Sequence, residues 1–178
     1  MTEAELIEQC KRENRKAQQI MYDRYAPKMY GICKRYVKNR EDAEDVLVEG
    51  FYKVFSKLRS FQGKGSFEGW MRRIMVNESL MFLRKQHNFQ ISLEVSNIEV
   101  KTEITAQDRL EEQDILELLK KLPTGYRTIF NLYVIEGYKH REIAEILGIS
   151  INTSKSQLIL AKEKMRKLIQ QNQYPSVG

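Results

Sequence analysis

The sequence has little of what disulfide frameworks and membrane anchors require. Its two cysteines, Cys10 and Cys33, lie far apart and form no Cys-x-x-Cys pair, which excludes a disulfide framework and a thiolate zinc site. No apolar run approaches the roughly 18 residues of a membrane-spanning helix, and the charged, amphipathic start MTEAELIEQCKREN is unlike a signal peptide. We therefore expect a cytoplasmic protein with reduced, structural cysteines and no membrane insertion.

Residues typical of enzyme sites are also scarce. The sequence has no glycine-rich phosphate loop and no cluster with metal-ligand spacing, and its two histidines are His87 and His140. His140 lies just ahead of a predicted helix, where a surface position or a phosphate contact is a simpler role than a general base. We expect no catalytic residues, no metal and no cofactor.

Strand alternation and hairpin dipeptides are missing, whereas helical periodicity covers most of the chain. Apolar residues recur at helical spacing from Ala4 to about Gln86 and from Asp114 to about Ile169. The intervening NFQISLEVSNIEVKTEITAQDRLEE is acidic and β-branched and lacks an apolar helical stripe. The sequence predicts an all-α protein with two small helical domains, 1–90 and 113–178, joined by an extended acidic linker over 91–112.

The net charge of +6 is unevenly distributed along the chain. Residues 1–90 hold 18 Lys and Arg against 12 Asp and Glu, residues 91–112 hold 2 against 6, and residues 113–178 hold 10 against 6. Two basic blocks therefore flank an acidic segment. Basic blocks favour a polyanionic partner, because cations that neutralise phosphates release condensed counterions. A soluble protein that is basic without such a partner is the alternative.

The second domain has the pattern of a helix-turn-helix. HREIAEILGIS predicts a short helix that ends at Gly148, and the Ser150 hydroxyl can cap the next helix. In LGISINTSKSQLILAK, small polar residues at the start of that helix are followed by aliphatic residues. This order is typical of a recognition helix, whose first residues contact DNA bases and whose later residues pack against the rest of the domain. A structural helical hairpin is the alternative. The DNA-binding candidates here are Arg141, Thr153, Lys155, Ser156 and Gln157.

In the first domain, NREDAEDVLVEGFYKVFSKL predicts a helix with one apolar face. The opposite face mixes carboxylates with a valine and a tyrosine, which favours docking of a basic protein partner. A solvated acidic stripe is the alternative. The candidate docking residues are Glu41, Asp45, Val48, Glu49 and Tyr52.

The next segment, SFQGKGSFEGWMRRIMVNESLMFLRKQ, interleaves three glycines with aromatic residues. It predicts a loop that carries aromatic surfaces, followed by a helix with cations along one stripe. Aromatic rings can stack on unpaired bases while cations follow the phosphate backbone. The alternative is that the aromatic rings belong to the core. The nucleic-acid candidates are Phe67, Trp70, Arg73, Asn77, Arg84 and Lys85.

Taken in order, three segments resemble the bacterial sigma-70 family, and within it the small two-domain extracytoplasmic-function group. DAEDVLVEGFYKVF resembles the helix that binds the polymerase clamp, and FEGWMRRIMVNESLMFLRK resembles the segment that melts and reads the minus-ten element. LPTGYRTIFNLYVIEGYKHREIAEILGISINTSKSQLILAKEKM is similar to the domain for the minus-thirty-five element. The resemblance covers nearly the whole chain and implies a promoter-specificity subunit with no covalent chemistry of its own.

The resemblance also implies partners. Asp45 and Glu49 would contact the clamp helices of the largest subunit of core RNA polymerase, and the flap of the second subunit is a further contact. The minus-ten strand of promoter DNA would meet the first domain, with a flipped base near GKGSF. The acidic linker would run through the polymerase toward its RNA exit path. An anti-sigma protein covering both domains is a further partner of such factors, which the sequence does not identify.

Some positions depart from the family pattern. Val48 stands where glutamine is typical, so the docking patch is more apolar. Gln157 and Leu160 stand where arginine is frequent, and Ser154 where valine is. Losing two cations lowers the predicted salt dependence of minus-thirty-five binding by up to about two phosphate equivalents. Base choice is then expected to rest on Thr153, Lys155, Ser156 and Gln157.

A repressor or activator with the same helix-turn-helix is the rival to this interpretation. Such a protein binds palindromic duplex DNA as a dimer without any polymerase. The rival interpretation assigns no function to the first domain.

Overall fold

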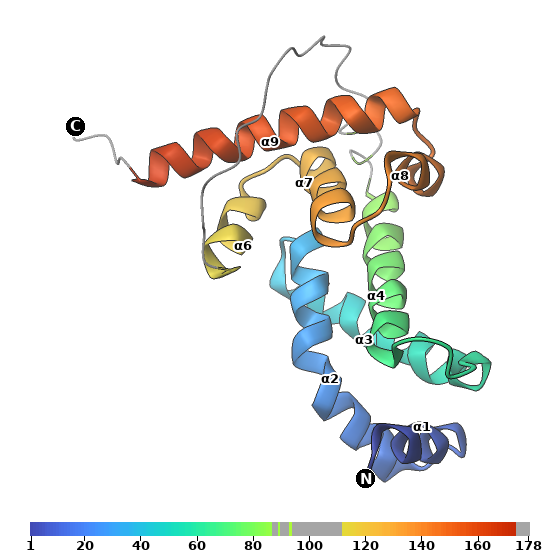
Figure 1. Cartoon of the computed structure of the whole chain (residues 1–178). Coiled ribbons are helices and arrows are strands. Elements are labelled where there is room, and N and C mark those ends of the chain that lie inside the picture. The colour runs from blue at the N-terminus through green and yellow to red at the C-terminus, as the bar shows by residue number, and fades with distance from the viewer. Residues whose placement is uncertain (87–88, 90–92, 94–111, 174–178) are drawn as a thin grey trace. The chain divides into compact units, whose positions relative to one another are not determined.

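The computed structural model describes residues 1–86, 89, 93 and 112–173, and the chain divides into two compact units, Met1–Lys85 and Gln86–Gly178 (Figure 1). The described residues contain helices and no strand, which confirms the all-α prediction. Most of the predicted linker, 91–112, lies outside the described residues. Within it, Leu93 is buried in the second unit and Glu112 begins a helix.

The first unit contains four α-helices and one 3-10 turn. They are α1 (Glu3–Lys11), α2 (Arg15–Tyr36), α3 (Arg40–Lys57), η1 (Leu58–Ser60) and α4 (Phe67–Arg84). Each α-helix begins at a side chain that accepts a hydrogen bond from a backbone amide of the first turn, as helix capping requires. The capping residues are Thr2, Asn14, Asn39 and Ser66. Helices α2, α3 and α4 pack against one another in pairs.

The contact between α3 and α4 depends on Gly50. A Cβ atom at Gly50 would overlap the Sδ atom of Met75 on α4. Met75 is fully buried, so its side chain has little room to move away. The absence of a side chain at Gly50 therefore allows the close approach of the two helices that carry the predicted partner and DNA surfaces.

The second unit is built around its last helix. Its elements are α6 (Glu112–Lys120), α7 (Thr124–Phe130), the π-helical η2 (Asn131–Ile135), α8 (His140–Leu147) and α9 (Ile151–Gln173). Helix α9 packs against α6, α7 and α8. One apolar cluster joins the end of α9 to α6 and comprises Leu118, Leu119, Leu122, Met165 and Ile169.

The turn between α8 and α9 has the predicted chemistry. Gly148 ends α8 with a left-handed φ of 66°, a conformation that glycine adopts without strain. The Ser150 Oγ accepts a 3.0 Å hydrogen bond from the backbone N–H of Thr153 and so caps α9. These two features confirm the helix-turn-helix boundaries predicted from LGIS.

Both cysteines are buried and free, in agreement with the sequence. Burial raises the pKa of Cys10 and of Cys33 to about 11, so both thiols stay protonated near neutral pH. Among the helices that the structure describes, none is both long and apolar enough to cross a membrane. The described residues also hold no cluster of three metal-ligating side chains.

Candidate functional site

The outward face of α3 carries all five residues predicted to dock a protein partner. The helix buries Val46, Leu47 and Gly50 toward the core, which turns the opposite face to solvent. On that face Val48 is 61% exposed and Tyr52 is 67% exposed, one turn apart. The two side chains form an exposed apolar patch one turn long, and such a patch rimmed by polar residues suits a protein partner. The carboxylate positions of the face, Glu41, Asp45 and Glu49, are exposed as well.

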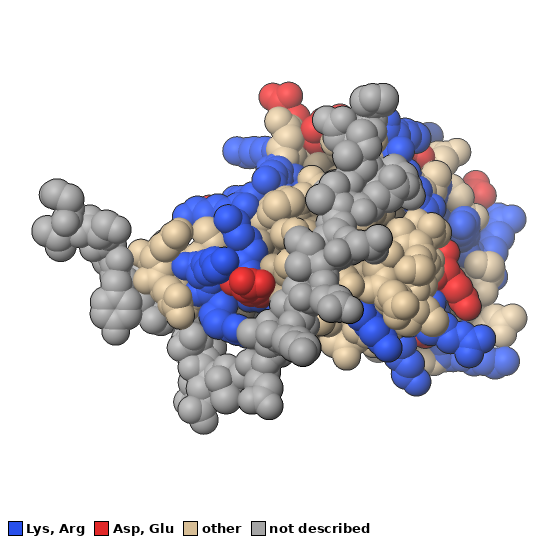
Figure 2. Space-filling view, turned by 90° about the horizontal axis from the view of Figure 1, so that it is seen from above, with Lys and Arg blue, Asp and Glu red and all other residues tan. Residues whose placement is uncertain are grey.

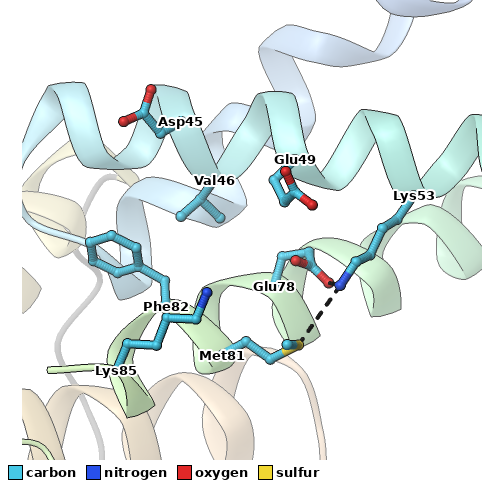
Figure 3. Close-up of a pocket in the computed structure, with 8 residues that line it drawn as sticks. All are labelled: Asp45, Val46, Glu49, Lys53, Glu78, Met81, Phe82 and Lys85. Carbon is cyan, nitrogen blue, oxygen red and sulfur yellow. Dashed lines mark hydrogen bonds and ion pairs between the residues drawn. The ribbon is translucent and has the colours of Figure 1, made fainter.

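A groove of about 320 Å³ lies between α3 and α4 beside this face (Figure 3). Its lining residues are Asp45, Val46, Glu49, Lys53, Glu78, Met81, Phe82 and Lys85. The Nζ of Lys53 donates a 2.6 Å hydrogen bond to the Oε1 of Glu78, whose side chain is almost fully buried. Because an unpaired carboxylate would be costly to bury, this ion pair allows Glu78 to remain inside the unit. Asp45 points away from α4 (Figure 3).

The aromatic residues around the glycine loop form a cluster inside the first unit. Phe67 is only 2% exposed, and its ring lies 5.2 Å from Phe61, 5.7 Å from Tyr25 and 5.7 Å from Trp70 between centroids. Neighbouring rings therefore already cover Phe67, and its predicted contact with DNA stays a prediction that requires this cluster to open. Trp70 is half-buried and keeps part of its surface open to solvent.

Helix α4 presents a polar stripe to solvent. The residues of this stripe fall on one helical face, since their separations of three, seven and fourteen positions return to nearly the same angle. Trp70 begins the stripe, and Arg73, Asn77 and Arg84 continue it, all three exposed. Lys85 follows directly after the helix and is also exposed. The structure thus places Trp70, Arg73, Asn77 and Arg84 on one stripe, whereas Lys85 lines the groove beside α3.

In the second unit, a histidine joins the two helices of the helix-turn-helix. The Nδ1 of His140 and the Oγ of Ser154 are 2.8 Å apart, and the Tyr133 ring stacks on the imidazole at 4.4 Å. Burial lowers the pKa of His140, and the charges of Lys155 and Lys162 lower it further. His140 is half-buried and links α8 to α9, a role that its place before a predicted helix did not indicate.

Gln157 is buried inside the second unit. It was predicted to read bases, but it is 0% exposed, and its Nε2 donates a 2.9 Å hydrogen bond to the carbonyl oxygen of Leu93. Its place three residues after the buried Ser154 puts it on the inner face of α9. Gln157 therefore supports the fold of the second unit.

The other predicted residues of the helix-turn-helix differ in exposure. Lys155 is exposed, and Ser156 is half-buried. Thr153 is half-buried and its hydroxyl lies 2.8 Å from the Ser150 hydroxyl, so the cap already occupies it. Arg141 on α8 is exposed, with its Nε 3.8 Å from Glu145. In the space-filling view, most of the charged side chains that can be seen are Lys and Arg (Figure 2).

Sequence reasoning missed two exposed residues at the start of α9. Ile151 is 43% exposed, although isoleucine is usually buried, and Asn152 is exposed beside it. Counting forward from the Ser150 cap would have placed both in the first turn, with Asn152 on the side opposite the buried Ser154.

Known proteins match both units. The sequence model of sigma-70 region 2 matches residues 21–89, and that of sigma-70, region 4 matches residues 112–165. The chain is 30% identical over 183 residues to the ECF RNA polymerase sigma-E factor of Haemophilus influenzae, with 96% of each chain covered. It is 34% identical over 137 residues to the RNA polymerase sigma factor SigV of Bacillus subtilis, covering 77% of this chain and 81% of that one.

Solved structures show the same fold. The sigma factor RpoE from Bartonella quintana, in complex with the anti-sigma factor NepR, is 20% identical with a TM-score of 0.52 over 85% of this chain and 96% of that one. CnrH, in complex with the cytosolic domain of CnrY, is 21% identical with a TM-score of 0.51 over 93% of this chain and 95% of that one. With two region models in order and relatives aligned over nearly the full length, the chain belongs to the sigma-70 family of RNA polymerase sigma factors, in its extracytoplasmic-function group.

Proposed function

We propose that this sigma factor binds the clamp helices of core RNA polymerase through the outward face of α3. It then reads the minus-ten element with the polar stripe of α4 and the minus-thirty-five element with α8 and α9. The observation that carries the first assignment is the exposure of Val48 and Tyr52 among carboxylates. Such a surface suits a partner that offers both apolar side chains and cations.

The α4 stripe supports the second assignment. Opening a duplex unstacks bases, which costs a few kcal/mol per base and must be offset by contacts to the separated strand. Trp70 offers a partly open ring for stacking, and Arg73 and Arg84 offer cations for the phosphates. These groups bind and position the strand, and we assign no covalent step to the chain.

An anti-sigma protein is a further partner that we propose for the same α3 face. The lining of the groove between α3 and α4 includes the apolar side chains of Val46, Met81 and Phe82. A silencing protein that filled the groove would also cover Glu49, which lines it. Such a protein would compete with core polymerase. Equal binding of core in the presence and absence of a saturating inhibitor would contradict a shared surface.

The α3 assignment is tested by reversing one charge. Asp45→Arg places a cation against a basic partner surface, and like charges at an interface cost several kcal/mol, so core affinity should fall about 100-fold or more. Asp45 is exposed, so the fold should be unchanged by circular dichroism. Titration of labelled variant with core polymerase measures the effect.

The matched control is Asp23→Arg, which reverses an exposed carboxylate on α2. We expect its core affinity to equal that of the wild type. Equal affinity of the Asp45→Arg variant and the control would show that the docking face lies elsewhere.

A further inference from the structure

Three side chains at the start of α9 share one exposed side of the helix. Ile151 and Asn152 occupy the first turn, and Lys155 lies one turn after Ile151. At 100° per residue the three span about 100° of the helix surface. Ser154, Gln157 and Leu158 occupy the adjoining arc of about 100° and are buried, with Leu158 about 20° from Ile151. This orientation fixes which part of α9 can meet a base edge.

One of the side-chain amides that was expected to read DNA lies on the buried side of α9. Gln157 is enclosed and bonded to the Leu93 carbonyl, and the Thr153 hydroxyl is engaged by the Ser150 cap. Asn152 is an exposed side-chain amide in the first turn, and within the described part of the chain it makes no side-chain hydrogen bond. Its donor and acceptor are both available to a ligand.

We propose that Asn152 reads an adenine of the minus-thirty-five element, with Ile151 against the methyl group of a neighbouring thymine. The inference rests on the function of the second unit as a promoter-binding domain. An asparagine amide can donate to adenine N7 while its oxygen accepts from N6, and an apolar side chain fits the thymine C5-methyl in the major groove. An exposed isoleucine beside an exposed asparagine therefore favours A·T pairs at this end of the helix.

Lys155 completes this surface in a different way. Its flexible ammonium group acts as a point charge that suits a phosphate oxygen, and such a contact carries no base information. The proposal thus gives two roles to one face: Asn152 sets base choice, and Lys155 strengthens binding to all sequences alike.

The test uses the whole sigma factor assembled with core polymerase. Promoter fragments randomised across the minus-thirty-five region are selected for binding by the wild type, by Asn152→Ala and by Gln170→Ala, an exposed amide later on α9. A bidentate base contact is worth about 5-fold to about 150-fold in discrimination, so Asn152→Ala should lose that much preference for adenine at one position. The Gln170→Ala control should keep the wild-type preference.

Two further variants sharpen the result. Ile151→Ala should weaken the thymine preference at the adjoining position, and Lys155→Ala should lower binding to all sequences and reduce the salt dependence by about one phosphate equivalent. Wild-type base preferences in Asn152→Ala, with promoter-dependent binding retained, would overturn the inference. A wild-type holoenzyme that selected no sequence at all would instead overturn the function on which the inference rests.

Discussion

The two units of this sigma factor bury different kinds of side chain. The described buried polar residues of the first unit are Glu78 and Ser79, and the rest of its interior is apolar and aromatic. The second unit buries a larger polar set, consisting of Arg127, Thr128, Asn131, Ser154 and Gln157. Apolar periodicity therefore identifies the inner and outer faces of the first unit better than those of the second.

The difference follows from what each unit presents outward. In the first unit, the proposed partner and DNA surfaces lie on the outer faces of helices whose inner faces are apolar, as on α3. In the second unit, α9 packs against three other helices and is also the helix that we propose reads DNA. Polar side chains such as Ser154 serve the packing through hydrogen bonds, so polarity alone does not mark the DNA-facing side.

The apolar packing of the first unit leaves no room for a side chain at Gly50. Gly50→Ala places a methyl group on the buried Met75 side chain, and overpacking of this kind costs about 1–3 kcal/mol. We expect the free energy of unfolding of the first unit to fall by that amount, measured by hydrogen exchange of α3 and α4 amides.

Gly31 provides the matched control, because nothing lies within 4 Å of a Cβ atom built there. Gly31→Ala replaces a helical glycine and should be neutral or stabilise by up to about 1 kcal/mol. Equal destabilisation by both substitutions would contradict the close α3–α4 contact.

The polar interior of the second unit is tested at Gln157. Gln157→Ala leaves the Leu93 carbonyl without its donor, and an unsatisfied buried group costs about 1–3 kcal/mol. Hydrogen exchange should show a less stable α9, while the promoter sequence that the holoenzyme selects should not change. If Gln157→Ala altered base preference and left stability intact, the residue would be a base reader after all.

The second unit should also lose stability in mild acid. The pKa of His140 lies below its ordinary value of 6.5 because of burial, Lys155 and Lys162, so the folded state binds fewer protons than the unfolded state. The stabilising contribution is fully present above pH 6.5 and is lost as the pH falls below that value. Hydrogen exchange of α8 and α9 amides between pH 8 and pH 5 measures the change.

His140→Asn is the control for this pH dependence. Without the imidazole, the exchange-derived stability of α8 and α9 should vary less over the same range. The amides of α2 in the first unit, which lie outside this polar interior, serve as the internal reference. An unchanged pH dependence in His140→Asn would assign the effect to other groups.

The sequence predicted the helices, the two-domain division and the turn chemistry well, because caps such as Ser150 and glycines such as Gly148 act locally. It predicted the exposed α3 face for the same reason, since Gly50 and Leu47 mark the inner side. It did not predict the burial of Phe67 and Gln157, which depends on the Tyr25 ring and the Leu93 carbonyl, both distant in sequence. Such contacts are set by tertiary packing, which single-sequence periodicity does not encode.

The most direct test of this account is promoter-dependent transcription. Core polymerase is mixed with fragmented genomic DNA of the source organism, with and without this chain, and run-off transcripts are mapped. We expect transcripts that begin at defined sites only when the chain is present, each preceded by common minus-ten and minus-thirty-five elements. Identical transcripts with and without the chain would contradict the account.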